Sequence, residues 1–265
     1  MRYVRIFFIY LQDVFEYRSI AVVWFLVSVI NPLLYLMFWR GTMTAPAGAA
    51  AFSSVADVTS YYLLYLILGG FLMAHIEHEV AYWDIKEGGL VKYILKPFSY
   101  FSFKFLQELS WRIVMGLLAL TAYLVLTYIF GHLFSITLTP FQWMIVLLSC
   151  VLWLLVAFVF KMIIGLTALW VVEFNGIEQT VFVASLLFSG YVVPLDMSPR
   201  WVQFFAYLTP FPYILYYPIR LIQGKVSSEQ SLMVIGIQLV WLILLGLLYK
   251  VVWSRGAKRF TGVGL

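Results

Sequence analysis

The sequence is poor in charge and in cysteine. Only 11% of its 265 residues are charged, whereas 64% are hydrophobic; soluble domains carry about 25% charged residues. So few charges cannot cover the surface of a water-soluble fold, so the chain is predicted to be an integral membrane protein. The single cysteine, Cys150, excludes an intrachain disulfide. The same composition excludes disorder and a collagen-like chain.

Several motifs that carry chemistry are also missing. No G-x-x-x-x-G-K-[ST] loop is found, so the chain lacks that means of holding a nucleotide, and no H-E-x-x-H, G-x-S-x-G or C-x-x-C occurs. The net charge of +5 is interpreted as the cytoplasmic bias of a membrane protein, not as a nucleic-acid surface. We therefore expect no catalytic site, no metal and no nucleic-acid partner.

Six apolar stretches are long enough to cross a bilayer, which takes about 20 residues. Four of them are 19–39, 58–74, 179–195 and 230–249. The other two come from 113–160, which is divided by breaks at 131–132 and 139–140, and the second of these continues to about 171. Prolines interrupt a seventh stretch, 201–219, and proline breaks helices. The segment 194–225 is therefore predicted to be an extracellular re-entrant hairpin.

Lysine and arginine set the orientation. With the N-terminus inside, most of these residues fall in cytoplasmic segments, which places both termini in the cytoplasm. Residues 1–18 place Val4, Phe7 and Leu11 at helical spacing, which predicts an amphipathic helix in the membrane interface. The predicted fold class is an all-α membrane protein, with one domain over 1–265, six transmembrane helices, an N-terminal interfacial helix and the extracellular re-entrant helical hairpin.

The most polar segment is the cytoplasmic loop 76–100, for which three interpretations stay open. His75, His78 and Glu79 have the spacing to meet on one helical face and bind a metal. The loop could instead be a solvated helix end. As a third alternative it is a docking element, in which a short helix over 90–95 follows a turn at Gly88 and Gly89 and ends before Pro97.

Two further features call for a structural explanation. Lys161 lies deep in an apolar stretch, where a charge is costly unless paired, and is predicted to pair with Glu108 or Glu173 or else to extend toward the headgroups. Glu173, Asn175, Gly176 and Glu178 are predicted to form a tight polar turn on the cytoplasmic side.

Three blocks together resemble the permease subunits of ABC type-2 transporters, in a bacterial exporter branch. They are IKEGGLVKYILKPFSY in the cytoplasmic loop, FSGYVVPLDMSPRWVQFFAYLTPFPYILYYPIRLIQGK over 188–225, and the C-terminal SRGAKRFTGVGL. The loop is less basic than the family pattern around WDIKEGG. The three blocks occur in the family's order, and the resemblance covers nearly the whole chain.

The resemblance implies a transport subunit that is not itself an enzyme, in the cytoplasmic membrane of a bacterium. It implies cytoplasmic ABC ATPase subunits that hold ATP and Mg, a second permease copy (identical or paralogous) and no cofactor on this chain. Three residue groups follow. The residues expected to couple to the ATPase are Glu87, Gly88, Gly89, Lys92, Tyr93, Lys96 and Pro97. The residues expected along the translocation path are Ser28, Asn31, Tyr61, Tyr65, Ser185 and Ser189. The residues expected at the extracellular gate are Pro194, Pro199, Pro210, Pro212 and Pro218.

Two other functions remain as alternatives. A membrane-embedded enzyme would use His75, His78 and Glu79 at the interface. An ATP-independent channel or secondary transporter would need ionisable groups near the membrane centre, for which Lys161 is the candidate.

Overall fold

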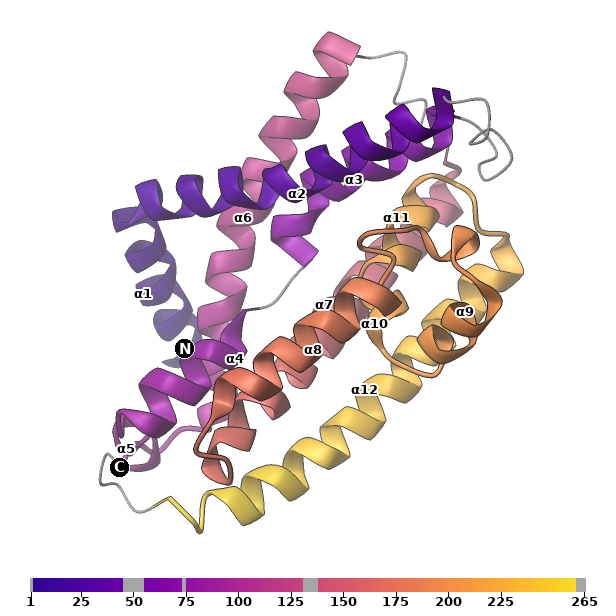
Figure 1. Cartoon of the computed structure of the whole chain (residues 1–265). Coiled ribbons are helices and arrows are strands. Elements are labelled where there is room, and N and C mark those ends of the chain that lie inside the picture. Colours follow the sequence, from indigo (N-terminus) through magenta and orange to yellow (C-terminus); the bar gives the residue numbers. More distant parts are fainter. Residues whose placement is uncertain (1, 45–54, 73–74, 131–137, 261–265) are drawn as a thin grey trace.

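The computed structural model describes residues 2–44, 55–72, 75–130 and 138–260. Within these ranges every regular element is a helix and no strand occurs, which confirms the all-α class. Figure 1 shows that several of the long helices run between two ends of the molecule.

Seven helices form the body of the molecule. They are α1 (Arg2–Glu16), α2 (Arg18–Thr44), α3 (Val55–Leu72), α6 (Tyr100–Phe130), α7 (Pro140–Leu166), α8 (Phe174–Phe188) and α12 (Ser228–Gly256). The connections contain shorter elements: α4 (Ile76–Glu79), the π-helix η1 (Val80–Lys86), α5 (Val91–Ile94), η3 (Thr167–Leu169), η4 (Leu195–Met197), α9 (Arg200–Tyr207), α10 (Phe211–Ile214) and α11 (Tyr216–Ile222).

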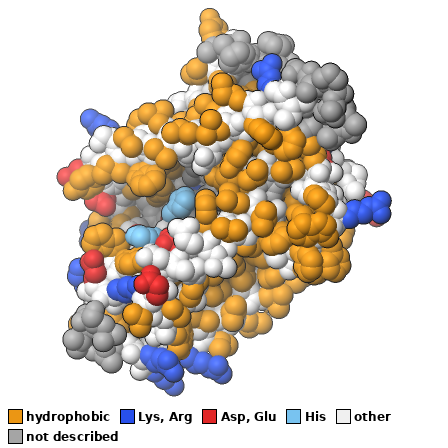
Figure 2. Space-filling model, in the orientation of Figure 1, with side chains coloured by type: hydrophobic (Ala, Val, Ile, Leu, Met, Phe, Trp, Pro, Cys, Tyr) orange, Lys and Arg blue, Asp and Glu red, His pale blue; other side chains and the backbone are white. Residues whose placement is uncertain are grey.

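Four helices, α2, α6, α7 and α12, are long and apolar enough to cross a membrane. The other two predicted crossings correspond to α3 and α8, which are apolar but shorter. Large hydrophobic side chains lie exposed along α2, α6, α7, α8 and α12, whereas α3 is largely buried among the other helices. Figure 2 shows a wide apolar surface between charged ends. Such a surface is expected where lipid replaces water.

Some predicted boundaries differ from the structure. The Thr139-Pro140 break is the start of α7, where Thr139 caps the helix and accepts a hydrogen bond from the Gln142 amide. The break predicted at 131–132 lies outside the described residues. α6 begins at Tyr100, well before position 113. A search for charge-free stretches missed its first turns because they carry charged residues, which are buried in the structure. α7 ends at Leu166 and continues directly into η3, so the apolar span ends at Leu169, close to the predicted 171.

The fifth predicted crossing, 179–195, is displaced. α8 begins at Phe174, so Asn175 and Gly176 lie in its first turn and Glu178 just after it, and they do not form a separate polar turn, which corrects that prediction. The helix ends at Phe188, and the chain continues without regular structure as far as Pro194. A search for charge-free residues misplaced this helix because its N-terminal turn is polar but helical.

The prediction that 201–219 is no single span is confirmed. The segment is divided into α9, α10 and α11, each of eight residues or fewer. Pro194, Pro199 and Pro210 occupy the positions before η4, α9 and α10, where a missing amide hydrogen removes no helical hydrogen bond. Pro212 and Pro218 lie inside the four- and seven-residue helices that follow.

The helices place two groups of connections at opposite ends. α4, α5 and the C-terminal end of α12 lie at one end of the molecule, and α9, α11 and the start of α12 lie at the other (Figure 1). We call these the loop end and the hairpin end. The amphipathic helix α1 is present as predicted and packs along α6 near the loop end, with Leu11 and Val14 against a buried cluster and Phe8 exposed.

Candidate functional site

The turn at the centre of the polar loop requires both of its glycines. Gly88 has φ of 76°, in the left-handed region that favours glycine. A Cβ on Gly89 would lie 2.5 Å from the carbonyl oxygen of Trp83. The Gly89 amide donates to that same oxygen at 3.2 Å, and the Leu90 amide donates to the Asp84 carbonyl at 2.7 Å. The chain therefore reverses here as predicted, and a side chain at either position would disrupt the turn.

The helix that follows is shorter than predicted. α5 covers Val91–Ile94, and Leu90 and Leu95 flank it instead of belonging to it. Leu90 is fully buried, whereas Leu95 is 79% exposed. Pro97 is exposed and separates α5 from α6. The loop thus presents one buried and one exposed side.

Buried charges attach this loop to α6. Lys104 is fully buried, and its Nζ lies 2.5 Å from Glu79 Oε1 and 2.7 Å from Asp84 Oδ2. Tyr100 Oη donates to Asp84 at 2.6 Å, and Gln107 Nε2 donates to Glu79 at 2.9 Å. Burial raises the pKa of the Asp84 carboxyl, and the Lys104 charge partly opposes that rise. Because buried charges need partners, this network fixes the loop in one position.

A second contact joins the loop to α7. A Cβ on Gly165 would lie 2.8 Å from the Glu77 carbonyl oxygen and 2.7 Å from the Val80 Cβ, so α4 and α7 approach closely. Lys161 forms an ion pair with Glu77, which is buried. Burial raises the pKa of Glu77 against the opposing effect of Lys161.

The pairing of Lys161 corrects both predicted partners. Glu108 instead accepts from Arg112 at 2.7 Å, one turn along α6. Glu173 is the residue that precedes α8, and the partner of Lys161 is Glu77 instead. The sequence did not favour Glu77, because the pairing depends on how closely α4 packs against α7.

The exposed side of the loop is apolar with a charged border. Trp83, Ile94 and Leu95 are 59%, 48% and 79% exposed. The charged residues that lie exposed beside them are Glu87, Lys92 and Lys96. Apolar side chains on a rigid, polar loop are typical of a surface that contacts another protein.

Among the predicted coupling residues, Tyr93 has a different environment from the others. Its ring is half-buried, with its centre 5.3 Å from the Tyr100 ring centre and 5.2 Å from the Lys104 Nζ. Tyr93 therefore holds α5 against α6, whereas Glu87, Lys92 and Pro97 are exposed. Lys96 is exposed too, but its Nζ lies 5.5 Å from the ring centre of Phe103 on α6.

The residues considered for a metal site do not converge. His75 lies before α4 and so does not share its helical face. His78 Nδ1 lies 3.5 Å from Glu178, and Glu79 is engaged by Lys104 and Gln107. In the described part of the chain, no three His, Cys, Asp or Glu side chains form a group that could hold a metal ion.

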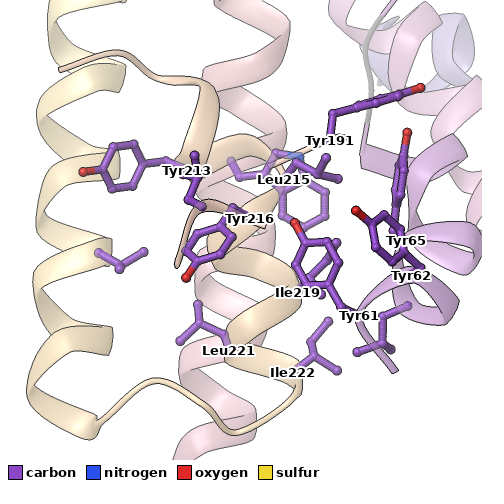
Figure 3. Packing of buried hydrophobic residues seen from close by; sticks show 14 of the residues in the cluster. Tyr61, Tyr62, Tyr65, Tyr191, Tyr213, Leu215, Tyr216, Ile219, Leu221 and Ile222 are labelled. Carbon is purple, nitrogen blue, oxygen red and sulfur yellow. The ribbon is translucent and has the colours of Figure 1, made fainter. Parts of the chain in front are cut away.

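The predicted path residues fall into two sets. Tyr61 and Tyr65 are buried in the protein interior. Tyr61 Oη donates to the Gly190 carbonyl at 2.9 Å, and the Tyr65 ring centre lies 4.9 Å from that of Tyr191. Figure 3 shows these rings among the buried tyrosines between α3 and the hairpin end. Ser189 is also buried, next to Gly190.

The remaining path residues are dispersed. Asn31 is exposed on α2. Ser28 and Ser185 donate to carbonyl groups of their own helices, at Phe25 and Phe182. The structure therefore brings Tyr61, Tyr65 and Ser189 together near the hairpin end, but not Ser28, Asn31 and Ser185.

An ion cluster at the hairpin end was not predicted. Arg220, on α11, is 4% exposed and forms ion pairs with Asp57 on α3 and with Asp196 on η4. We call these three residues the outer ion cluster. The signal in the sequence was weak: Asp57 precedes an apolar stretch and Arg220 follows one, and counting charges assigned both to loops.

Comparison with known proteins agrees with this architecture. A family model described as "ABC-2 family transporter protein" matches residues 21–264. No curated protein and no solved structure matches the chain.

Proposed function

The chain belongs to the ABC-2 family of transporter membrane proteins, and on that premise we propose that it is the permease subunit of an ATP-driven exporter. In this proposal it forms the translocation path and couples to separate cytoplasmic ATPase subunits, which hold ATP and Mg. A second permease copy, identical or paralogous, completes the path. The complex is placed in the cytoplasmic membrane of a bacterium.

The observation that carries the proposal is the construction of the polar loop. Its inner side is fixed to α6 by Lys104, Asp84 and Glu79 and to α7 by the ion pair of Lys161 with Glu77. Its outer side exposes Trp83 and other apolar groups. A partner that moves this loop would therefore move α6 and α7 with it, which is the property a coupling element requires.

Six crossings are proposed, with α3 and α8 as the second and the fifth. α8 has 15 residues and spans roughly 22 Å at 1.5 Å per residue, less than the ~30 Å of hydrocarbon. The irregular residues that follow, Ser189 to Tyr191, are buried by protein. Irregular backbone is tolerated at membrane depth when protein covers it, so this segment supports a completed crossing.

The segment 194–225 is proposed to be the re-entrant hairpin on the outer side. Of its three short helices, α10 and α11 pack against α7 and against each other, and α9 packs against α8 and α10. Leu195, Ala206 and Ile219 are fully buried. Prolines prevent a continuous helix here, and packing against α7 provides the protein contact that a broken helix in a membrane needs.

The mechanism then follows from rigid connections. ATP binding closes the paired ATPases, each ATPase displaces the loop that it contacts, and the helices joined to that loop rotate between inward- and outward-open arrangements. ATP shifts this equilibrium only because it favours one arrangement of the ATPases over the other.

The test is reconstitution in liposomes together with an ABC ATPase whose gene lies next to that of this chain, to be identified from the adjacent open reading frames. We expect the permease to change the ATPase rate and both chains to co-purify. ATP-independent flux by the chain alone would contradict the proposal and favour a channel or secondary transporter. Turnover of a substrate by the isolated chain would favour an enzyme.

A further inference from the structure

One arginine joins three elements at the hairpin end. Arg220 Nη1 lies 3.0 Å from Asp57 Oδ1 and 3.1 Å from Asp57 Oδ2, and its Nη2 forms an ion pair with Asp196. The three residues come from α11, α3 and η4. A single guanidinium therefore fixes the position of the segment before α9 relative to α3.

The surroundings of Arg220 leave it few alternatives. Its guanidinium carbon lies 5.3 Å from the Tyr61 ring centre and 5.7 Å from that of Tyr216. Gln223 accepts from Arg220 at 2.9 Å and donates to Ser60 Oγ at 2.7 Å. Because a buried charge without a partner is costly, the cluster favours this one arrangement over others.

The segment held by this cluster covers the buried tyrosines. Besides the Asp196 contact, hydrogen bonds to its carbonyl groups retain it: Tyr61 donates to Gly190 at 2.9 Å, and Trp39 Nε1 donates to Val192 at 2.9 Å. These neutral bonds are each weaker than a charge-assisted one. Releasing the segment therefore requires the Arg220–Asp196 contact to break.

The two carboxylates differ in exposure. The Asp57 side chain is 6% exposed, whereas that of Asp196 is 46% exposed. Asp196 can exchange its arginine partner for water at a modest cost, but Asp57 cannot. The cluster therefore has one permanent contact, Arg220–Asp57, and one releasable contact, Arg220–Asp196.

We propose that the outer ion cluster is a latch that keeps residues 189–199 closed over Tyr61 and Tyr65, and that the Arg220–Asp196 contact breaks when the outer side of the transporter opens. This inference rests on the proposed function, because it places the hairpin end at the exit. It assigns the gate to a charge contact and not to the prolines, which shape the segment but make no releasable bond.

The experiment uses Ser189 as a reporter, since its side chain is buried at the start of the segment. Ser189→Cys is introduced in the full chain with Cys150→Ala, and cells are treated with a membrane-impermeant maleimide. Asp196→Asn should raise the labelling rate roughly two- to fivefold, the factor expected for one half-exposed ion pair. The matched control is Glu229→Gln, an exposed acid in the first turn of α12, which should leave the rate unchanged.

Asp57→Asn separates the latch from a merely structural cluster. It should lower the melting temperature of the chain in detergent, whereas Asp196→Asn should leave that temperature close to the parent value. Labelling at the parent rate in Asp196→Asn would overturn the latch, and so would equal loss of thermal stability in both variants.

The outcome is independent of the ATPase, because the labelling is compared between variants without added nucleotide. If Asp196→Asn accelerates labelling but the permease does not change the ATPase rate, the latch is supported and the proposed coupling is contradicted. If the permease changes the ATPase rate but the labelling rate of Asp196→Asn equals that of the parent, the coupling is supported and the latch is contradicted.

Discussion

Lys161 on α7 and Glu77 on α4 form an ion pair across 84 positions of sequence. Glu77 Oε2 is buried, and no hydrogen-bond partner for it occurs in the described part of the chain. The lysine therefore offsets a carboxylate that has little other support. A buried ion pair contributes little net stability, but removing one of its two partners is strongly destabilising because the other charge is left buried and unpaired.

Replacing Lys161 by Met should destabilise the chain. The change leaves Glu77 buried without its countercharge, which costs about 3 kcal/mol of unfolding free energy. Thermal unfolding in detergent measures the effect, and Lys250→Met, an exposed lysine on α12, is the control. Adding Glu77→Gln to Lys161→Met should recover much of the loss. A double variant as unstable as the single one would contradict the charge explanation.

Gly89→Ala should uncouple ATP hydrolysis from transport while the chain still inserts. The added Cβ meets the Trp83 carbonyl at 2.5 Å, so the turn must shift and α5 with it. Co-purification and permease-dependent ATPase activity provide the measurement. Gly236→Ala is the control, because a Cβ at that position meets nothing within 4 Å. Normal coupling in Gly89→Ala would show that the geometry of the turn is unimportant.

Leu95→Glu should weaken binding of the ATPase without destabilising the permease. Leu95 is 79% exposed, so a carboxylate there is readily hydrated in the free chain but would be buried by a partner. We expect at least about a tenfold loss of affinity, which corresponds to 1.4 kcal/mol. Leu208→Glu, with 60% exposure at the hairpin end, should bind as the parent does. Equal loss in the two variants would remove the docking assignment.

The hairpin topology can be tested by cysteine labelling. Arg200 and Lys225 lie exposed at the two ends of 200–225. In a Cys150→Ala background, Arg200→Cys and Lys225→Cys should both react with an impermeant thiol reagent from the outside, and Lys92→Cys should react only from the inside. Labelling of the first two positions from opposite sides would mean that the segment crosses the membrane.

The sequence predicted features governed by local chemistry. Thr139 and Pro140 specify a helix start, and Gly88 and Gly89 specify a turn, because capping and φ preferences act within a few residues. Long-range pairings could not be predicted in this way. Lys161 had several acidic candidates, and Arg220 was counted only as a loop charge. The start of α8 at Phe174 was missed because a polar first turn resembles a loop in composition.

The close approach at Gly165 has a consequence for how motion is transmitted. Because the backbone of α4 lies against α7 with no long side chain between them, a displacement of the loop cannot be absorbed by rotamer changes at that contact. α7 continues to the opposite end of the molecule, where it packs against α10 and α11. A shift of the polar loop would therefore be transmitted to the hairpin end along one continuous helix.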